Sequence, residues 1–192
     1  MVKGKPATDL PRVQLPMDLT VVFHERAHPS SCTAPQLVVL CPQNKIDLIQ
    51  WPAAREWPTD GSVWLLWPDS AARAVEDVSE EDINRVKEII VLEGTWPQAE
   101  SMANSASMRN LPRVKLSAVR SIFWKFSSRD AHCVSTLEAI YGFFVQAEKK
   151  KAERKFDNLL FYFKIGFDHT IAYYRANPDL IPPLNWEVDS NE

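Results

Sequence analysis

The sequence predicts an α/β domain built on a parallel sheet, and three observations lead to that prediction. Short apolar runs rich in β-branched residues alternate along the chain with segments that carry helix-start signals. Residues 91–99 place a strand, a tight turn and a helix start in direct succession, which is the unit that repeats in α/β folds. The chain of 192 residues is long enough for one substantial core but not for a second independent one.

The composition excludes several classes of protein. A hydrophobic content of 45% with 24% charged residues is ordinary for a globular protein, so we expect disorder only at the ends. No apolar run approaches the roughly 20 residues of a membrane helix, and residues 1–12 lack the apolar segment of a secretory signal. The three cysteines, Cys32, Cys41 and Cys133, form no CxxC pair. This fits a reducing compartment without a zinc knuckle, and we expect an intracellular protein of the cytosol or nucleus.

The first elements are predicted from β-branched runs and proline boundaries. Residues 1–14 belong to a polar, proline-containing lead that we expect to be flexible or to wrap the surface. Residues 19–23 predict a strand, followed by a polar loop over residues 24–34. His24 and His28 are four residues apart in this loop with no third partner nearby, so we expect no metal site.

The middle of the chain continues the alternation. Residues 36–41 are apolar and structured, residues 51–59 are rich in Trp and Pro and predicted to be irregular, and residues 62–67 predict a buried strand. Acids in the first turn predict a helix from residue 79 to about residue 87, and it leads into the strand that ends at Glu93.

The last third is predominantly helical. A short helix is predicted after Thr95, ending near residue 107, and a strand over residues 114–116. Ser135 and Glu138 form a capping box for a helix whose apolar positions recur at helical spacing. A long C-terminal helix is predicted from residue 156 until Pro178 closes it.

The turn after Glu93 has the features of a ligand site. Thr95 and Gln98 form a second capping box, and Pro97 suits a first helical turn. Such a turn lies at the carboxyl end of a parallel sheet, where ligands bind, and offers free backbone N–H groups to an anion. The carboxylate of Glu93 is then either a catalytic or orienting group, or a partner of the helix dipole.

A basic segment follows, with aromatic residues interspersed. No acid occurs from residue 109 to residue 129, and Phe123, Trp124 and Phe126 lie within this run. Its cations are Arg109, Arg113, Lys115, Arg120, Lys125 and Arg129. The pattern fits an RNA face that holds phosphates and stacks a base, and it fits equally a solvated rim on an acidic protein.

Several motifs together resemble those of a known family. Residues 93–96, Glu-Gly-Thr-Trp, resemble the Asp-x-Thr-Trp signature of the DTW-domain proteins. Companion motifs occur in the expected order: the loop from His24 to Thr33, Leu66-Trp67-Pro68, Leu111-Pro112, Phe123-Trp124, and residues 135–139. The resemblance covers residues 15–178, with residues 179–192 as a tail.

The resemblance implies a fold and an activity. It implies a SPOUT-like parallel sheet with flanking helices, a C-terminal trefoil knot and a helical C-terminus. It also implies transfer of the 3-amino-3-carboxypropyl group of S-adenosylmethionine to N3 of a uridine in tRNA, with release of methylthioadenosine. S-adenosylmethionine is then a co-substrate, tRNA or another structured RNA is the partner, and no metal or membrane is involved.

The resemblance also assigns roles to residues. Glu93 is the candidate base or orienting group. The residues implied in holding the donor are Thr33, Leu66, Trp67, Gly94, Thr95, Trp96, Leu111, Ser135 and Thr136. Trp96 has a second interpretation, as a core anchor at a helix start. Lys125 or Arg129 would hold a tRNA phosphate or the carboxylate of the donor.

Three departures from the family pattern lead to an alternative. Glu93 replaces the signature Asp, Ala27 replaces an acid of the loop, and Lys125 replaces an Arg. The N-terminal cysteine cluster of many members is also absent. The alternative is a catalytically weakened RNA-binding or RNP-assembly protein; a globular domain with no RNA role is a third hypothesis, against which the basic run argues.

Overall fold

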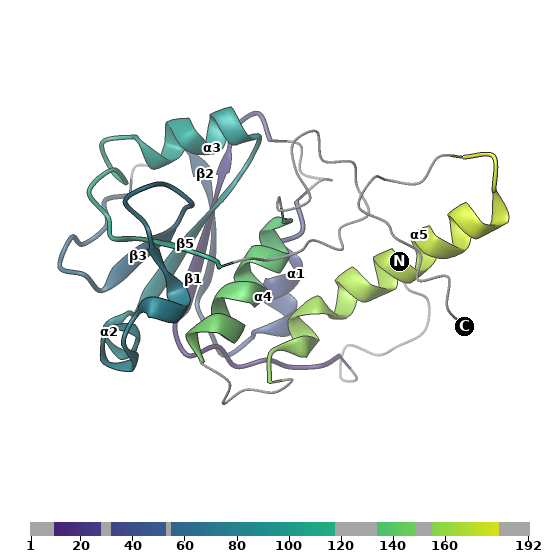
Figure 1. Ribbon diagram of the computed structural model, residues 1–192, viewed down its shortest axis with the longest axis horizontal. Coiled ribbons are helices and arrows are strands. Elements are labelled where there is room, and N and C mark those ends of the chain that lie inside the picture. The colour runs from purple at the N-terminus through teal and green to yellow at the C-terminus, as the bar shows by residue number, and fades with distance from the viewer. Residues whose placement is uncertain (1–9, 28–31, 53–54, 118–133, 149–154, 181–192) are drawn as a thin grey trace.

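A parallel sheet forms the centre of the molecule. The computed structural model describes residues 10–27, 32–52, 55–117, 134–148 and 155–180 (Figure 1). Within these residues lies a six-stranded sheet of order β2-β1-β5-β3-β6-β4, in which every pairing is parallel. The strands are β1 (Asp18–His24), β2 (Ile46–Trp51), β3 (Val63–Leu66), β4 (Arg73–Ala74), β5 (Glu88–Glu93) and β6 (Arg113–Lys115).

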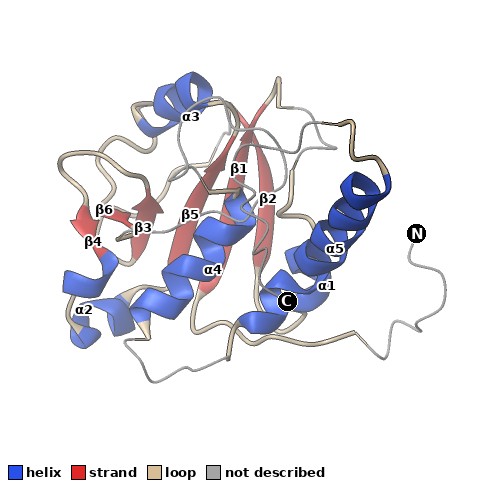
Figure 2. Ribbon diagram, turned by 45° about the vertical axis from the view of Figure 1, so that its right-hand side comes forward, coloured by secondary structure: helices blue, strands red, loops and turns tan. Residues whose placement is uncertain are grey.

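Helices cover both faces of the sheet. The helices are α1 (Gln36–Leu40), α2 (Glu80–Arg85), α3 (Trp96–Ala103), α4 (Thr136–Ala147) and α5 (Phe161–Ala176), with 3-10 helices at Val75–Asp77 (η3) and Asp157–Leu160 (η4). α1 and α4 pack on one face, while α3 covers the other (Figure 2). The sheet is therefore the middle of three layers, with each of its faces shielded from water by helices.

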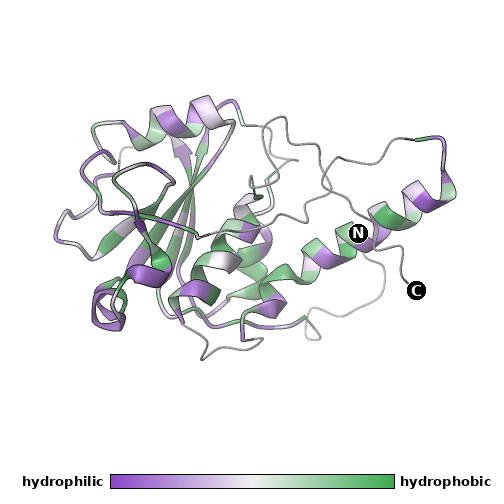
Figure 3. Ribbon diagram, in the orientation of Figure 1, coloured by the Kyte–Doolittle hydropathy of each residue, from purple (hydrophilic) through white to green (hydrophobic). Residues whose placement is uncertain are grey.

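The central strands are buried on both sides. In β5, Ile89 and Val91 belong to the core cluster under α1 and α4, and Ile90 belongs to the cluster under α3. Successive side chains of a strand point to opposite faces, so a continuous apolar run supplies both cores. Much of the central strands and of α4 is accordingly coloured green, for hydrophobic residues, in Figure 3.

The connections of two neighbouring strands diverge at the carboxyl edge. β1 and β5 are neighbours, with Phe23 opposite Glu93. The chain leaves β1 toward α1 on one face and leaves β5 toward α3 on the other. In open α/β sheets, the point where the connections diverge to opposite faces is where ligands bind.

Most of the predicted elements are confirmed. The strands expected at residues 19–23, 62–67 and 114–116 are β1, β3 and β6, and the expected α/β class with a parallel sheet is correct. Both predicted capping boxes are present, at Thr95 and at Ser135.

Other elements differ from the prediction. β2 was missed because this edge strand is only half-buried and carries polar residues, and the two-residue β4 is too short to show a pattern. The C-terminal helix opens with the 3-10 turn η4 instead of a continuous α-helix from residue 156. Val13, near the end of the predicted lead, is buried in the core together with Leu15. Residues 1–9 lie outside the described residues, so the flexible or wrapping lead stays a prediction. The connection over residues 118–133 lies outside the described residues, and the trefoil knot stays a prediction.

Candidate functional site

Three segments of the chain meet around Glu93. Glu93 is half-buried at the end of β5. The Thr136 hydroxyl, in the first turn of α4, donates a hydrogen bond to its Oε2. The Leu137 backbone N–H donates to Thr33 Oγ1 at 3.2 Å, which ties the loop after β1 to the same helix start. The structure thus brings Glu93, Thr33 and Thr136 together at the carboxyl edge of the sheet.

Gly94 allows the chain to turn tightly after Glu93. A Cβ on Gly94 would lie 3.0 Å from Gln98 Oε1 and 3.4 Å from His24 Cβ. That same Gln98 oxygen accepts a hydrogen bond of 2.8 Å from the Thr95 N–H, as half of the α3 capping box. A Cβ would press on these neighbours, and without it the backbone of the exposed turn stays accessible.

The start of α4 is fixed by its own capping box. The Ser135 N–H donates to Glu138 Oε2 at 2.8 Å, and the Glu138 N–H donates to Ser135 Oγ at 3.3 Å. Glu138 is buried, so the reciprocal pair is shielded from water. The Ser135 side chain therefore serves the helix, while Thr136 faces Glu93.

Two tryptophans lie beside the turn. Trp67 follows β3, and its backbone N–H donates to the Val114 carbonyl at 2.9 Å. Its ring lies 5.7 Å from that of Trp96 between centroids, with the planes at 48°. Trp96 is 38% exposed, so it is not the core anchor considered as an alternative from the sequence. The pair forms an aromatic surface at the N-terminus of α3.

Two of the residues predicted to hold the donor are core residues. Leu66 is 8% exposed and belongs to the core cluster beneath α1 and α4. Leu111 is 4% exposed and belongs to the cluster beneath α3. These two side chains therefore pack in separate cores on opposite faces of the sheet.

The predicted basic face is only partly formed by the described residues. The Arg113 guanidinium pairs with Asp69 and donates to the Ala103 carbonyl at 2.9 Å, with a side chain only 14% exposed. Lys115 Nζ lies 3.4 Å from the Asp69 carbonyl oxygen. Arg109 is exposed. The other predicted members, Arg120, Lys125 and Arg129, lie outside the described residues.

Cys32 is a site residue that sequence reasoning missed. Burial raises the pKa of the Cys32 thiol to about 11, and the charge of Glu93 and a hydrogen bond with its carboxylate add to this increase. Burial alone raises the pKa of Cys41 to about 11. The only sequence signal for Cys32 was its position directly before Thr33 in the polar loop.

His24 also lies at this edge of the sheet. It ends β1, its ring packs 5.3 Å from the Trp51 ring between centroids, and its Nδ1 accepts a hydrogen bond from the Arg26 N–H at 3.1 Å. Across the described part of the chain, no group of three or more His, Cys, Asp or Glu residues is arranged to hold a metal ion. In the same residues, no helix is both long and apolar enough to cross a membrane.

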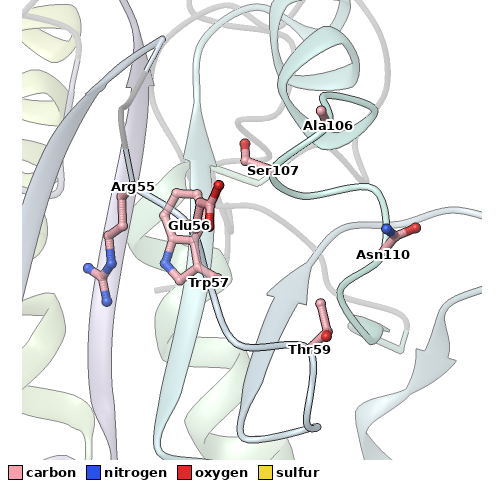
Figure 4. Close-up of a pocket in the computed structure, with 7 residues that line it drawn as sticks. All are labelled: Arg55, Glu56, Trp57, Thr59, Ala106, Ser107 and Asn110. Carbon is pink, nitrogen blue, oxygen red and sulfur yellow. The ribbon is translucent and has the colours of Figure 1, made fainter.

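A cavity lies toward the opposite, amino edge of the sheet. It has a volume of about 380 Å³ and none of the predicted site residues lines it (Figure 4). Its lining residues are Arg55, Glu56, Trp57, Thr59, Ala106, Ser107 and Asn110. Arg55 also pairs with Asp47 and with Glu88, the first residue of β5, so this cavity is on the side of the sheet away from Glu93.

The fold and the site define a class of protein. A parallel sheet with helices on both faces, and polar groups gathered where the connections diverge, defines an open α/β domain, a class whose members bind ligands at the carboxyl edge of the sheet. The chain belongs to the DTW-domain family, whose family model (DTW domain) matches residues 6–171. The resemblance predicted from the motifs is thereby confirmed.

Individual relatives and one solved structure are similar to the chain. It is 24% identical to tRNA-uridine aminocarboxypropyltransferase 1 of Mus musculus over 211 residues, covering 86% of this chain and 69% of the relative. It is 22% identical to the Xenopus laevis protein of the same name over 210 residues, covering 86% and 72%. The human protein of that name is 30% identical over 87 residues, covering 43% and 29%. The SAM-dependent rRNA:acp-transferase Tsr3 from Vulcanisaeta distributa aligns with a TM-score of 0.44 and 14% identity, covering 82% and 84%.

Proposed function

We propose that this protein transfers the 3-amino-3-carboxypropyl group of S-adenosylmethionine to N3 of a uridine in tRNA and releases methylthioadenosine. The observation that carries the proposal is the position of Glu93, which lies at the switch point of the sheet within hydrogen-bonding distance of Thr136. The names of the Mus musculus and Xenopus laevis relatives support the same reaction.

The chemistry requires a group that accepts a proton or orients the nucleophile. Uridine N3–H is a weak acid, and the Glu93 carboxylate takes its proton or holds it in a hydrogen bond while N3 attacks. A C–N bond forms at the carbon next to the sulfonium. The C–S bond breaks, and its electron pair leaves on sulfur as the neutral thioether of methylthioadenosine. The residues around Glu93 decide which carbon faces the nucleophile, which is a matter of positioning.

The residues at the site fit such a donor. The rings of Trp67 and Trp96 offer aromatic surface to a sulfonium cation. The exposed Gly94-Thr95 backbone and the helix start at Thr136 offer N–H groups to its polar ends. Thr33 and Ser135 act through the segments that they hold in place, and Leu66 and Leu111 through the hydrophobic packing beneath the site.

The RNA partner is part of the same proposal. Arg109 contacts a phosphate together with Arg120, Lys125 and Arg129, whereas Arg113 and Lys115 contribute less because both contact Asp69. The proposed fold is SPOUT-like with a trefoil knot, and the proposed setting is the cytosol or nucleus. No metal takes part in the proposed reaction.

The test uses purified protein, S-adenosylmethionine and tRNA. We expect methylthioadenosine to appear only when tRNA is present, and Glu93→Gln to lower the rate by about 100-fold or more while thermal unfolding stays near that of the wild type. Formation of adenosylhomocysteine instead would overturn the proposal, because it reports methyl transfer.

The second candidate is an RNA-binding protein that has lost turnover. The loop after β1 favours this candidate. The Ala27 N–H donates to the His24 carbonyl at 2.8 Å and closes a turn, and Ala27 has no carboxylate where the family pattern has an acid. A modified uridine that disappears in a Glu93→Ala strain, with RNA affinity intact, would reject this candidate. Filter binding at increasing salt separates both functions from a domain with no RNA role, because phosphate contacts give a steep salt dependence.

A further inference from the structure

Glu93 is held by side chains from two separate segments. Thr136, on α4, donates its hydroxyl proton to Oε2 of Glu93. Cys32, in the loop after β1, lies beside the same carboxylate, whose charge and hydrogen-bonding capacity help to raise the pKa of the thiol. The two donors reach the end of β5 from different connections of the fold.

The segments that carry these donors are themselves fixed. The Gln36 side chain donates to the Thr33 carbonyl at 2.6 Å, and the Leu137 N–H donates to Thr33 Oγ1 at 3.2 Å. The residue next to Cys32 is thereby linked to the residue next to Thr136. This linkage limits how far either donor can move from Glu93, since both belong to one hydrogen-bonded unit.

We propose that Cys32 and Thr136 are positioning residues that hold the Glu93 carboxylate in one orientation as the acceptor for the ligand. The proposal rests on the proposed function for the identity of that ligand, but the hydrogen-bonded unit itself can be tested without it. A half-buried acid that is held in this way offers a fixed acceptor to an N–H or cationic group.

The chemistry of Cys32 suits a donor and not a nucleophile. Burial and the neighbouring Glu93 raise the pKa of its thiol to about 11, so the thiol keeps its proton at neutral pH. The other titratable groups on the elements around it are His24, at the end of β1, and Glu138, whose carboxylate accepts from the Ser135 N–H in the α4 cap. Neither of these replaces Cys32 as the donor to Glu93.

The first experiment measures alkylation of Cys32 by iodoacetamide at increasing pH, in the full-length protein, with peptide mass spectrometry to resolve each cysteine. We expect Glu93→Gln to make Cys32 react faster at a given pH, by about tenfold for each unit by which its pKa falls. Cys41 is the internal control, because it is buried and Glu93 has no part in raising its pKa. If Glu93→Gln leaves the pH dependence of Cys32 alkylation unchanged while Cys41 stays unreactive, the proposal is overturned.

The second experiment compares paired variants that keep or remove each donor. We expect Cys32→Ala and Thr136→Val to lower kcat for methylthioadenosine release by about tenfold or more, and Cys32→Ser and Thr136→Ser to restore most of the loss. A merely structural role would not show this rescue, so equal rates in each pair would contradict the proposal.

The two experiments separate the failure of this inference from that of the proposed function. If the wild type releases no methylthioadenosine with tRNA, the proposed function fails, and the alkylation profile of Cys32 still decides whether Glu93 and Cys32 are coupled. If release is observed but Glu93→Gln leaves the Cys32 profile unchanged, the proposed function stands and the positioning role is rejected.

Discussion

At the scale of single residues, Gly94 shows how little space surrounds the turn after Glu93. Its absent side chain leaves room for Gln98 to cap α3 and for His24 to approach from β1. The close approach of these two elements therefore disfavours a side chain at this position. The sequence predicted the turn, but only the folded structure shows that His24 of β1 lies next to it.

We predict that Gly94→Ala destabilises the protein by about 1 kcal/mol or more and weakens donor binding, because the new Cβ presses on the Gln98 oxygen of the capping box. Urea unfolding and equilibrium binding measure the two effects. Gly61→Ala is the matched control: Gly61 has φ of 88° with nothing within 4 Å, so it should cost about 1 kcal/mol through backbone strain alone. Equal losses of affinity in both variants would contradict a local effect at the site.

Asp69 also depends on a partner that is distant in the sequence, because it forms an ion pair with Arg113. Partial burial opposes its ionisation, yet the hydrogen bond and charge of Arg113 lower the pKa of Asp69 below its ordinary value of 3.8. A carboxylate with a lowered pKa in the folded state stabilises the protein above its unfolded pKa, and the contribution disappears as the pH falls through the folded pKa.

We predict that Asp69→Asn is less stable than the wild type at about pH 6 and that the difference shrinks toward about pH 3. Urea unfolding of both proteins across this range measures it. RNA affinity is the companion measurement, and we expect little change because Asp69 pairs with Arg113 inside the domain. A stability difference that is constant with pH would show that the ion pair is not its source.

At the scale of elements, the two capped helices place the site. α3 begins at Trp96 directly after the Glu93 turn, and α4 begins at Thr136 beside it. A capping box fixes where a helix starts. At Ser135 and Glu138 it therefore also fixes where Thr136 meets Glu93.

We predict that Ser135→Ala lowers the free energy of unfolding by about 1 kcal/mol and also lowers transferase activity, since the start of α4 frays next to Glu93. Ser79→Ala is the matched control, because the Ser79 hydroxyl caps α2 by accepting from the Asp82 N–H at 3.0 Å, away from the site. It should show a similar loss of stability with full activity. Activity lost equally in both variants would point to general destabilisation.

At the scale of the whole molecule, charged groups also link the strands at the amino edge. The Arg55 guanidinium donates to Asp47 of β2 at 2.9 Å and to Glu88 of β5 at 2.7 Å, and Thr20 of β1 donates to the same glutamate. One side chain thus joins three strands and the segment that leads to β3. The edge where Glu93 lies and the edge that holds this ion cluster are opposite ends of the sheet.

We predict that Arg55→Met lowers the free energy of unfolding by about 2 kcal/mol, because Glu88, whose side chain is 12% exposed, loses its cation. The figure is below that of a fully buried pair because Arg55 is 29% exposed. Arg85→Met is the control: its i,i+4 partner Glu81 is 76% exposed, so the cost should be at most about 0.5 kcal/mol. Urea unfolding measures both, and similar values would contradict the proposed role of the cluster.

Local signals account for the parts of the fold that the sequence predicted. A helix start depends on residues within one turn, as at Thr95 and Ser135, and a buried strand on a short apolar run, as in β5. β2 was missed because an edge strand alternates less clearly, and its pairing with β1 is not encoded in its own residues.

By itself, the sequence determined the α/β class, the capped helices, the turn at Glu93 and the family. Only the tertiary structure decided the partners of Glu93, because Thr136 is 43 residues away in the sequence, and it paired Arg113 of the basic run with Asp69, 44 residues away. The physical reason is that caps and apolar runs act over a few residues, whereas a hydrogen bond between distant segments exists only once the sheet and its crossing connections have placed them side by side.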